Sequence, residues 1–113
     1  MNSIAKFANG DLLVSIRYTC ALYRISRDSG EIVWRLGGKK SDFEQDFTFL
    51  GQHDARVISQ NDTVTVISFF DNASTGDMPA FQKTANASSF KVVALHEEES
   101  PKRARVGSAQ TTV

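Results

Sequence analysis

The sequence is short of several features that would assign it to a familiar class. Its 113 residues include a single cysteine, Cys20, so no disulfide can form within the chain. Lysine plus arginine balance aspartate plus glutamate, 13 against 13, which predicts no surface for nucleic acid or for an anionic membrane. No apolar run approaches the ~18 residues of a membrane span. No basic and apolar signal peptide follows Met1.

Some sparse features leave two interpretations open. We interpret Cys20 as a small, part-buried apolar residue, and a partner cysteine in a longer protein is the alternative. Glycosylation sequons begin at Asn61, Asn72 and Asn86. They favour a glycoprotein whose full-length parent is extracellular or passes through the secretory pathway, although chance occurrence in Ser/Thr-rich loops is the alternative.

What the sequence does contain is short β-strand patterns separated by turn signals. Nothing in it has a helical period, so we predict an all-β fold. The strands expected in the first half are 4–7, 12–18, 21–26 and 32–36, and those expected in the second half are 55–59, 63–70, 90–95 and 103–106. Residues 39–50 are predicted to form a loop whose three phenylalanines pack on the strands. The chain from Glu97 onward is predicted to be solvated and to fray.

The two halves repeat one layout. Asn9-Gly10 predicts a two-residue hairpin turn, and Asn61-Asp62 marks the corresponding turn 52 residues later. A four-stranded unit that repeats at about 50 residues is typical of a propeller blade. We therefore predict about two blades, at 2–38 and 52–106, of an incomplete six-bladed β-propeller, with a disordered tail at 107–113. The open blade edges would allow self-association.

Hairpin geometry predicts which residues meet at the strand ends. A turn centred between Asn9 and Gly10 pairs residues whose numbers sum to 19, which places Asn2 opposite Arg17. A turn centred between Asn61 and Asp62 gives sums of 123, which places His53 opposite Phe70. If both hairpins are inner strands of adjacent blades, His53, Asn2 and Arg17 gather on one face; a slip of one residue would undo this arrangement.

These residue types suit the transfer of a sulfuryl or phosphoryl group. A histidine that is neutral near pH 7 can attack the electrophilic centre and hold the group covalently. Arginine and asparagine offer donors for the oxygens of the group. The alternatives are a hydrogen-bonded histidine at a strand end and a solvated arginine. Asp54 and Arg56 are interpreted as an ion pair, His96 as part of a solvated acidic tip, and no metal-ligand spacing is present.

Several segments, in this order and spacing, resemble the arylsulfotransferase family, in its eukaryotic secreted branch. They are NGDLLVSIR at 9–17, GEIVWRLGG at 30–38, QHDAR at 52–56 and ISFFDNA at 67–73. The resemblance covers residues 2 to about 106. It implies transfer of a sulfuryl group from an aryl sulfate to a phenol through a sulfated histidine, with neither a metal nor a nucleotide sulfate donor. His53 matches the sulfated histidine, and Asn2 and Arg17 match residues around the sulfate.

The sequence departs from the family pattern at its start. The family motif has a histidine two residues before the position of Asn2 and another in an earlier blade, and this sequence has neither. We therefore expect half a site in a truncated product, and no activity from the chain alone. A non-catalytic binding module and an inactive fragment remain the alternatives.

Overall fold

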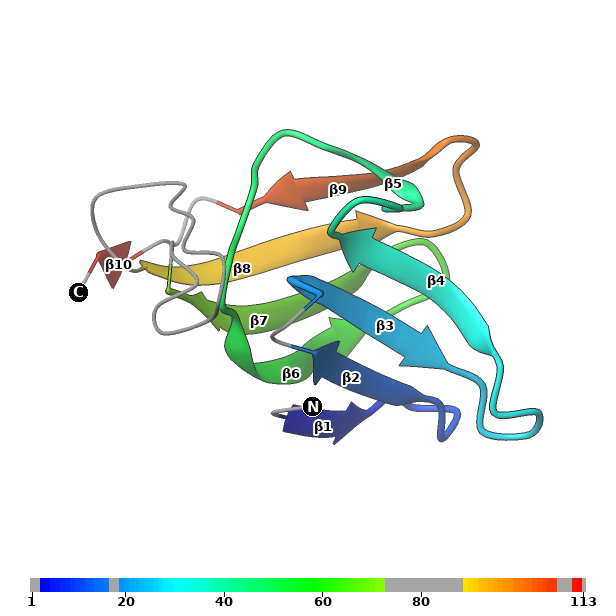
Figure 1. Cartoon of the computed structure of the whole chain (residues 1–113). Coiled ribbons are helices and arrows are strands. Elements are labelled where there is room, and N and C mark those ends of the chain that lie inside the picture. Colours follow the sequence, from blue (N-terminus) through cyan, green and yellow to red (C-terminus); the bar gives the residue numbers. More distant parts are fainter. Residues whose placement is uncertain (1–2, 17–18, 73–88, 108–110, 113) are drawn as a thin grey trace.

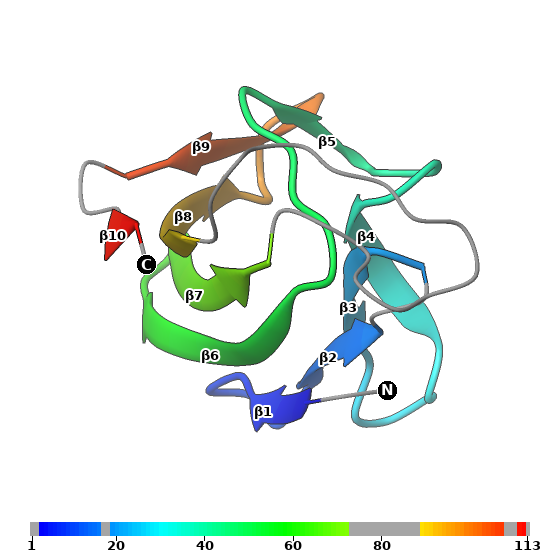
Figure 2. The same ribbon diagram turned by 60° about the vertical axis from the view of Figure 1, so that its left-hand side comes forward.

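The computed structural model describes residues 3–16, 19–72, 89–107 and 111–112, and over these ranges it is all-β, as the sequence predicts. The strands are β1 Ser3–Lys6, β2 Leu12–Ile16, β3 Ala21–Ile25, β4 Ile32–Gly37, β5 Phe43–Gln45, β6 His53–Gln60, β7 Thr65–Asp71, β8 Ser89–His96, β9 Lys102–Val106 and β10 Thr111–Thr112. They form two separate sheets, which are direct neighbours in both views (Figure 1, Figure 2). The described ranges contain no helix that is long and apolar enough to cross a membrane.

The first sheet is an antiparallel meander in the order β1-β2-β3-β4. All four strands fall where the sequence predicts them, to within two residues at each end that the structure describes. The alternation of side chains turns Leu13, Leu22, Trp34 and Leu36 inward, and none of them is more than 1% exposed.

The second sheet repeats the meander and extends it. Strands β6, β7, β8 and β9 are successive antiparallel neighbours, as the sequence predicts. The prediction of an unbroken loop at 39–50 is wrong, because β5 forms within it and pairs in parallel with β9. Three residues are too few to show a strand period, and their pairing partner lies about 60 residues away in the chain. Thr111–Thr112 form β10, which pairs with β8.

One hydrophobic core joins the sheets face to face. It contains side chains from both sheets and from the segment between them, namely Phe7, Leu13, Leu22, Trp34, Leu36, Phe43, Phe49, Ala55, Ile67, Phe69, Val93, Leu95 and Ala104. The predicted packing of the loop aromatics is confirmed. Phe43 lies edge-on to Trp34 with ring centroids 5.1 Å apart, Phe49 contacts Phe69, and Phe47 packs against the same cluster. Cys20 is also buried, as expected.

The predicted register of the first hairpin is off by one residue. Ile4 pairs with Val14, so paired numbers sum to 18 and the turn holds three residues, closed by a hydrogen bond from Phe7 N to Asp11 O. Gly10 alone in this turn has a positive φ, 94°, whereas a two-residue type I′ turn needs two such residues. Asn9 instead accepts a hydrogen bond from the Asp11 main chain.

The second hairpin reaches the predicted pairing by another route. Gln60 pairs with Thr65 across a four-residue loop, so its register near the turn differs from the prediction. Irregularities between Ser59 and Val57, and again between Arg56 and His53, shift the register back. His53 therefore lies opposite Phe70, as predicted, because two β-bulges compensate for the longer turn.

The prediction that the chain is solvated from Glu97 onward is wrong for Glu97 itself. Glu97 is only 16% exposed in its side chain, because it closes a polar cluster between the sheets. Arg24 Nη1 donates to both of its oxygens at 3.0 Å, and Trp34 Nε1 and Thr65 Oγ1 donate at 2.6 and 3.0 Å. His96 does stay near the surface and contacts Glu99 at 3.3 Å.

Candidate functional site

His53 is the first residue of β6, at the end of the sheets where β2 and β7 finish (Figure 1). Its imidazole is half-buried and rests on the ring of Phe70, with ring centroids 5.0 Å apart and a tilt of 45°. Within the described ranges no hydrogen bond to the His53 ring is found. Packing on Phe70 therefore places the ring, and its partial exposure suits a group that must meet a reactant.

The backbone next to His53 has an irregular conformation that fixes where the ring lies. Asp54 has a φ of +54°, in the left-handed region that L-residues with a side chain rarely adopt. It falls inside the bulge between His53 and Arg56. Bulges are over-represented beside active sites, where they re-aim a side chain. Nothing in the sequence signals this bulge, because Asp-Ala-Arg is compatible with a regular strand.

Gln52 anchors the chain immediately before His53. It is fully buried, and its Nε2 donates to the main-chain oxygens of Ala21 at 2.9 Å and Ile16 at 3.2 Å. Ser15 Oγ donates back to the Gln52 carbonyl at 3.3 Å. The start of β6 is thus tied to the ends of β2 and β3. The sequence does not predict this role, since a lone glutamine carries no pattern that distinguishes it from a surface residue.

A buried ion pair lies on the strands beside Phe70. Lys91 Nζ is 3.1 Å from Asp71 Oδ2, and the two side chains are 10% and 3% exposed. Lys91 also donates to Ser89 Oγ at 3.0 Å, and Asp71 Oδ1 accepts a hydrogen bond from Leu50 N at 3.1 Å. Paired and hydrogen-bonded in this way, the charges hold the ends of β7 and β8 and the segment before β6 together.

Two of the three predicted site residues, Asn2 and Arg17, lie outside the described residues. Their chain neighbours Ser3 and Ile16 are described, and both face the start of β6. Ser3 Oγ accepts a hydrogen bond from Ala55 N at 3.2 Å, and Ile16 O accepts one from Gln52. The structure therefore describes His53 and the strand ends around it, and the roles of Asn2 and Arg17 stay predictions.

The interpretation of Asp54 and Arg56 as an ion pair is confirmed. Arg56 Nε lies 3.1 Å from Asp54 Oδ1, and both side chains are more than half exposed, so this ion pair belongs to the solvated face. Within the described ranges, His, Cys, Asp and Glu side chains do not gather in a group of three or more that could hold a metal ion.

Fold and site together define the class: an all-β protein of two facing sheets, with a part-exposed histidine held at the ends of the strands. A sequence profile of the arylsulfotransferase (ASST) family matches residues 1–107. The chain belongs to this family. Searches of curated proteins and of solved structures found no significant match.

Proposed function

We propose that the protein transfers a sulfuryl group from an aryl sulfate to a phenol, with His53 as the residue that carries the group. The observation that supports this most is the part-exposed imidazole of His53, placed by a bulge at the strand ends inside a chain that matches the arylsulfotransferase family. The proposal extends to the architecture: the two facing sheets are adjacent blades of a six-bladed propeller of the secreted branch, with His53 toward its central channel.

The chemistry divides into two displacements at sulfur. A ring nitrogen of neutral His53 attacks the sulfur of the aryl sulfate, and the bond from sulfur to the aryl oxygen breaks. That oxygen leaves with the electron pair and takes up a proton to become a phenol. The oxygen of a second phenol then loses its proton and attacks the sulfur, the sulfur–nitrogen bond breaks, and its electron pair returns to the imidazole.

The remaining roles follow from the charge on the sulfuryl oxygens. Arg17 presents a planar fork of donors and Asn2 an amide, and both are proposed to hold these oxygens as charge redistributes. The ring of Phe70 packs against the imidazole and supports it. The Asp71–Lys91 pair is internally neutralised, so it fixes the strand ends without placing a net charge next to the anionic substrate.

The test is sulfuryl transfer by the protein that carries this chain, from an aryl sulfate that releases a coloured phenol. We expect release of the phenol and, on rapid acid-free quenching, a sulfuryl group on the peptide that contains His53, detected by mass spectrometry. His53→Ala should abolish both. The matched control is His96→Ala, which changes the only other histidine in the chain and should leave both unchanged.

Two outcomes would overturn the proposal. Transfer that persists in His53→Ala would exclude His53 as the carrier. Aryl sulfate that binds equally to both proteins without any transfer would identify a binding module in place of an enzyme.

A further inference from the structure

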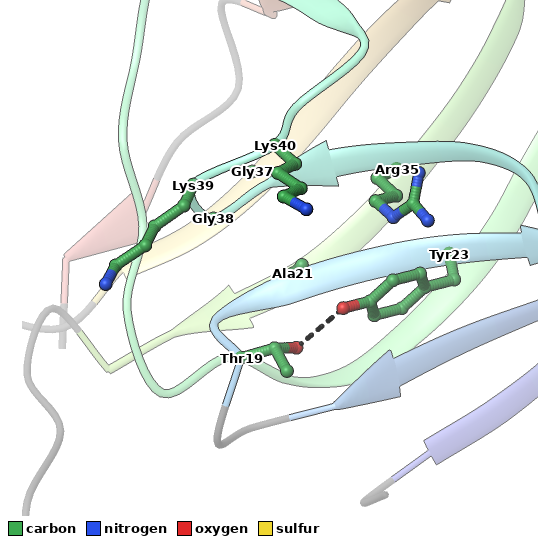
Figure 3. A pocket seen from close by; sticks show the side chains of 8 residues that line it. All are labelled: Thr19, Ala21, Tyr23, Arg35, Gly37, Gly38, Lys39 and Lys40. Atoms are coloured by element: carbon green, nitrogen blue, oxygen red, sulfur yellow. Dashed lines mark hydrogen bonds between the residues drawn. The ribbon is translucent and has the colours of Figure 1, made fainter.

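We propose a second ligand site, whose lining does not include His53: a pocket on the β3–β4 face that binds a small aromatic anion. The proposal goes beyond sulfuryl transfer and rests on no step at His53. The pocket has a volume of about 300 Å³, at the lower end of the range of ligand sites. Its wall and floor come from neighbouring positions of the two strands and the turns that flank them, namely Thr19, Ala21, Tyr23, Arg35, Gly38 and Lys40 (Figure 3).

Strand register builds the floor of the pocket. Ala21 pairs with Gly37 and Tyr23 pairs with Arg35, so two successive cross-strand pairs point to the same face of the sheet. Ala21 carries only a methyl group, so it leaves space beside the larger pair, and the ring of Phe49 packs where a side chain of Gly37 would lie. The Tyr23 ring provides apolar surface that an aromatic ring can cover, whereas Ala21 is only 2% exposed and lies at the bottom of the pocket.

Two glycines, the last residue of β4 and the residue after it, shape the turn beside this space. Gly37 and Gly38 have φ values of +83° and +71°, a region that favours glycine. A side chain at Gly37 would collide with the ring of Phe49, and a Cβ at Gly38 would lie 3.0 Å from the main-chain oxygen of Thr19. The close approach of backbone at these positions turns the chain so that Lys39 and Lys40 follow directly at the rim.

The charge of the pocket selects an anion. Arg35, Lys39 and Lys40 line it, and no acidic residue does. No ion pair links any of these three cations to a carboxylate in the described part of the chain. Asp42, which lies two residues after Lys40, instead accepts a hydrogen bond from the main-chain N of Arg35 at 2.7 Å. The guanidinium and ammonium groups are therefore available to a bound anion.

The hydroxyl of Tyr23 already donates a hydrogen bond within the protein. It donates to Thr19 Oγ1 at 3.0 Å, and Thr19 Oγ1 donates in turn to Ile16 O at 3.1 Å (Figure 3). Tyr23 thus offers its ring and not a donor, and Arg35 and Lys40 supply the donors. Figure 3 shows Lys39 extending away from the other two cations, so it contributes less. A flat ring that carries one anionic group fits both parts of the pocket.

The first experiment locates the site. Phenyl sulfate is titrated into the isotope-labelled full chain, and amide chemical shifts are followed by NMR. We expect the largest changes at Gly37, Gly38 and Ala21, and the same changes in His53→Ala. Changes confined to the surroundings of His53, or a loss of the Gly37 and Gly38 changes in His53→Ala, would overturn the second site while leaving sulfuryl transfer intact.

The second experiment tests the donors by affinity. Arg35→Gln and Lys40→Gln should each weaken phenyl sulfate binding about tenfold, the effect of one lost charge-assisted hydrogen bond. Lys39→Gln should weaken it less, and Lys102→Gln on β9 should not change it. Equal losses in all four variants would indicate non-specific charge attraction and overturn the proposal. Unchanged circular dichroism and melting temperature establish that each variant is folded.

The third experiment separates the aromatic part from the anionic part. Tyr23→Phe keeps the ring and should retain binding, whereas Tyr23→Ala should weaken it. Phenol and inorganic sulfate should each bind more weakly than phenyl sulfate. Inorganic sulfate that binds as tightly as phenyl sulfate would reduce the pocket to a simple anion site, and phenol that binds as tightly would remove the role of the cations.

Discussion

The two sheets are joined at both ends, by different chemistry. At the end remote from His53, charged side chains make the connection: Arg24 lies between Asp11 and Glu97, with its guanidinium 4.1 Å above the ring of Phe7. At the His53 end, neutral groups make it: Gln52 and Ser3 exchange hydrogen bonds with main-chain atoms of the other sheet.

The charged and the neutral contacts differ in their effect on a substrate at His53. Ion pairs that hold the remote end cannot perturb an anion at His53, because they lie at the other end of the strands. Neutral hydrogen bonds hold the backbone near His53 without adding a charge that would compete for the substrate. We infer that the protein places the charged contacts between its two sheets at the remote end and uses neutral contacts between them at the His53 end, where the Asp71–Lys91 pair lies within one sheet.

The largest effect is expected from Arg24→Met. The substitution keeps most of the side-chain volume but leaves Asp11 and Glu97 buried without their shared cation, with side chains only 12% and 16% exposed. Breaking a buried ion pair in this way costs about 3–5 kcal/mol of unfolding free energy. Urea unfolding followed by tryptophan fluorescence reports directly, since Trp34 donates to Glu97 at 2.6 Å.

The matched control for Arg24→Met is Arg27→Met. Arg27 lies three residues further along the chain, and its side chain is 66% exposed beside Asp28. A loss for Arg24→Met no larger than for Arg27→Met would mean that the charged cluster does not hold the sheets together.

The next largest effect is expected from Gln52→Leu at the neutral end. It removes the side-chain donor to Ala21 O and Ile16 O inside a fully buried site, and Ile16 O keeps only its hydrogen bond from Thr19 Oγ1 among those that side chains donate to it. The expected cost is about 1–3 kcal/mol of unfolding free energy. Gln60→Leu is the control, because Gln60 also bridges the sheets, through Ala8 N, but from an exposed position. Equal melting temperatures for the two variants would contradict the anchoring role of Gln52.

The sequence predicts the regular parts of the fold and not its irregular parts. Strand alternation and turn residues locate eight strands, and repetition locates the corresponding hairpins, because these signals are local. The bulge at Asp54 and the parallel pairing of β5 depend on contacts distant in the chain, so no local pattern reveals them. The burial of Glu97 is not predictable for the same reason: an acidic run predicts a solvated segment, and only the folded chain places Arg24 and Trp34 next to it.

The candidate site also has one residue that the sequence predicts and one that it does not. His53 was found because its residue type and its place at a strand end both carry information. Its anchor Gln52 was not, since burial of a lone glutamine follows only from the packing of three strands around it. The pairing of His53 with Phe70 was predicted from a register that holds at that pair alone, where two bulges cancel the error in turn length.

A pH dependence sharpens the contrast between the two ends. Burial alone would raise the pKa of Asp11, but hydrogen bonds from Arg27 N, Arg24 and Asn9, with the charge of Arg24, lower it below its ordinary value of 3.8. A carboxyl whose pKa is lowered on folding stabilises the fold above its unfolded pKa, and this stability is lost as pH falls through the folded pKa. Unfolding free energy should therefore fall as pH drops below about 4. Asp11→Asn should flatten that slope, whereas Gln52→Leu should leave it unchanged.

The smallest effect is expected from Arg56→Gln, which breaks an ion pair only three residues from His53. Arg56 and Asp54 are 69% and 58% exposed, so solvent screens their attraction, and the loss should stay below about 0.5 kcal/mol. The Arg24 and Arg56 pairs are both arginine–aspartate contacts of about 3 Å, but Arg24 is buried and also binds Glu97, so its loss should be the larger. If Arg56→Gln destabilised the chain as much as Arg24→Met, the left-handed Asp54 would depend on this ion pair, and the His53 end would carry charge-dependent stability beyond that of the Asp71–Lys91 pair.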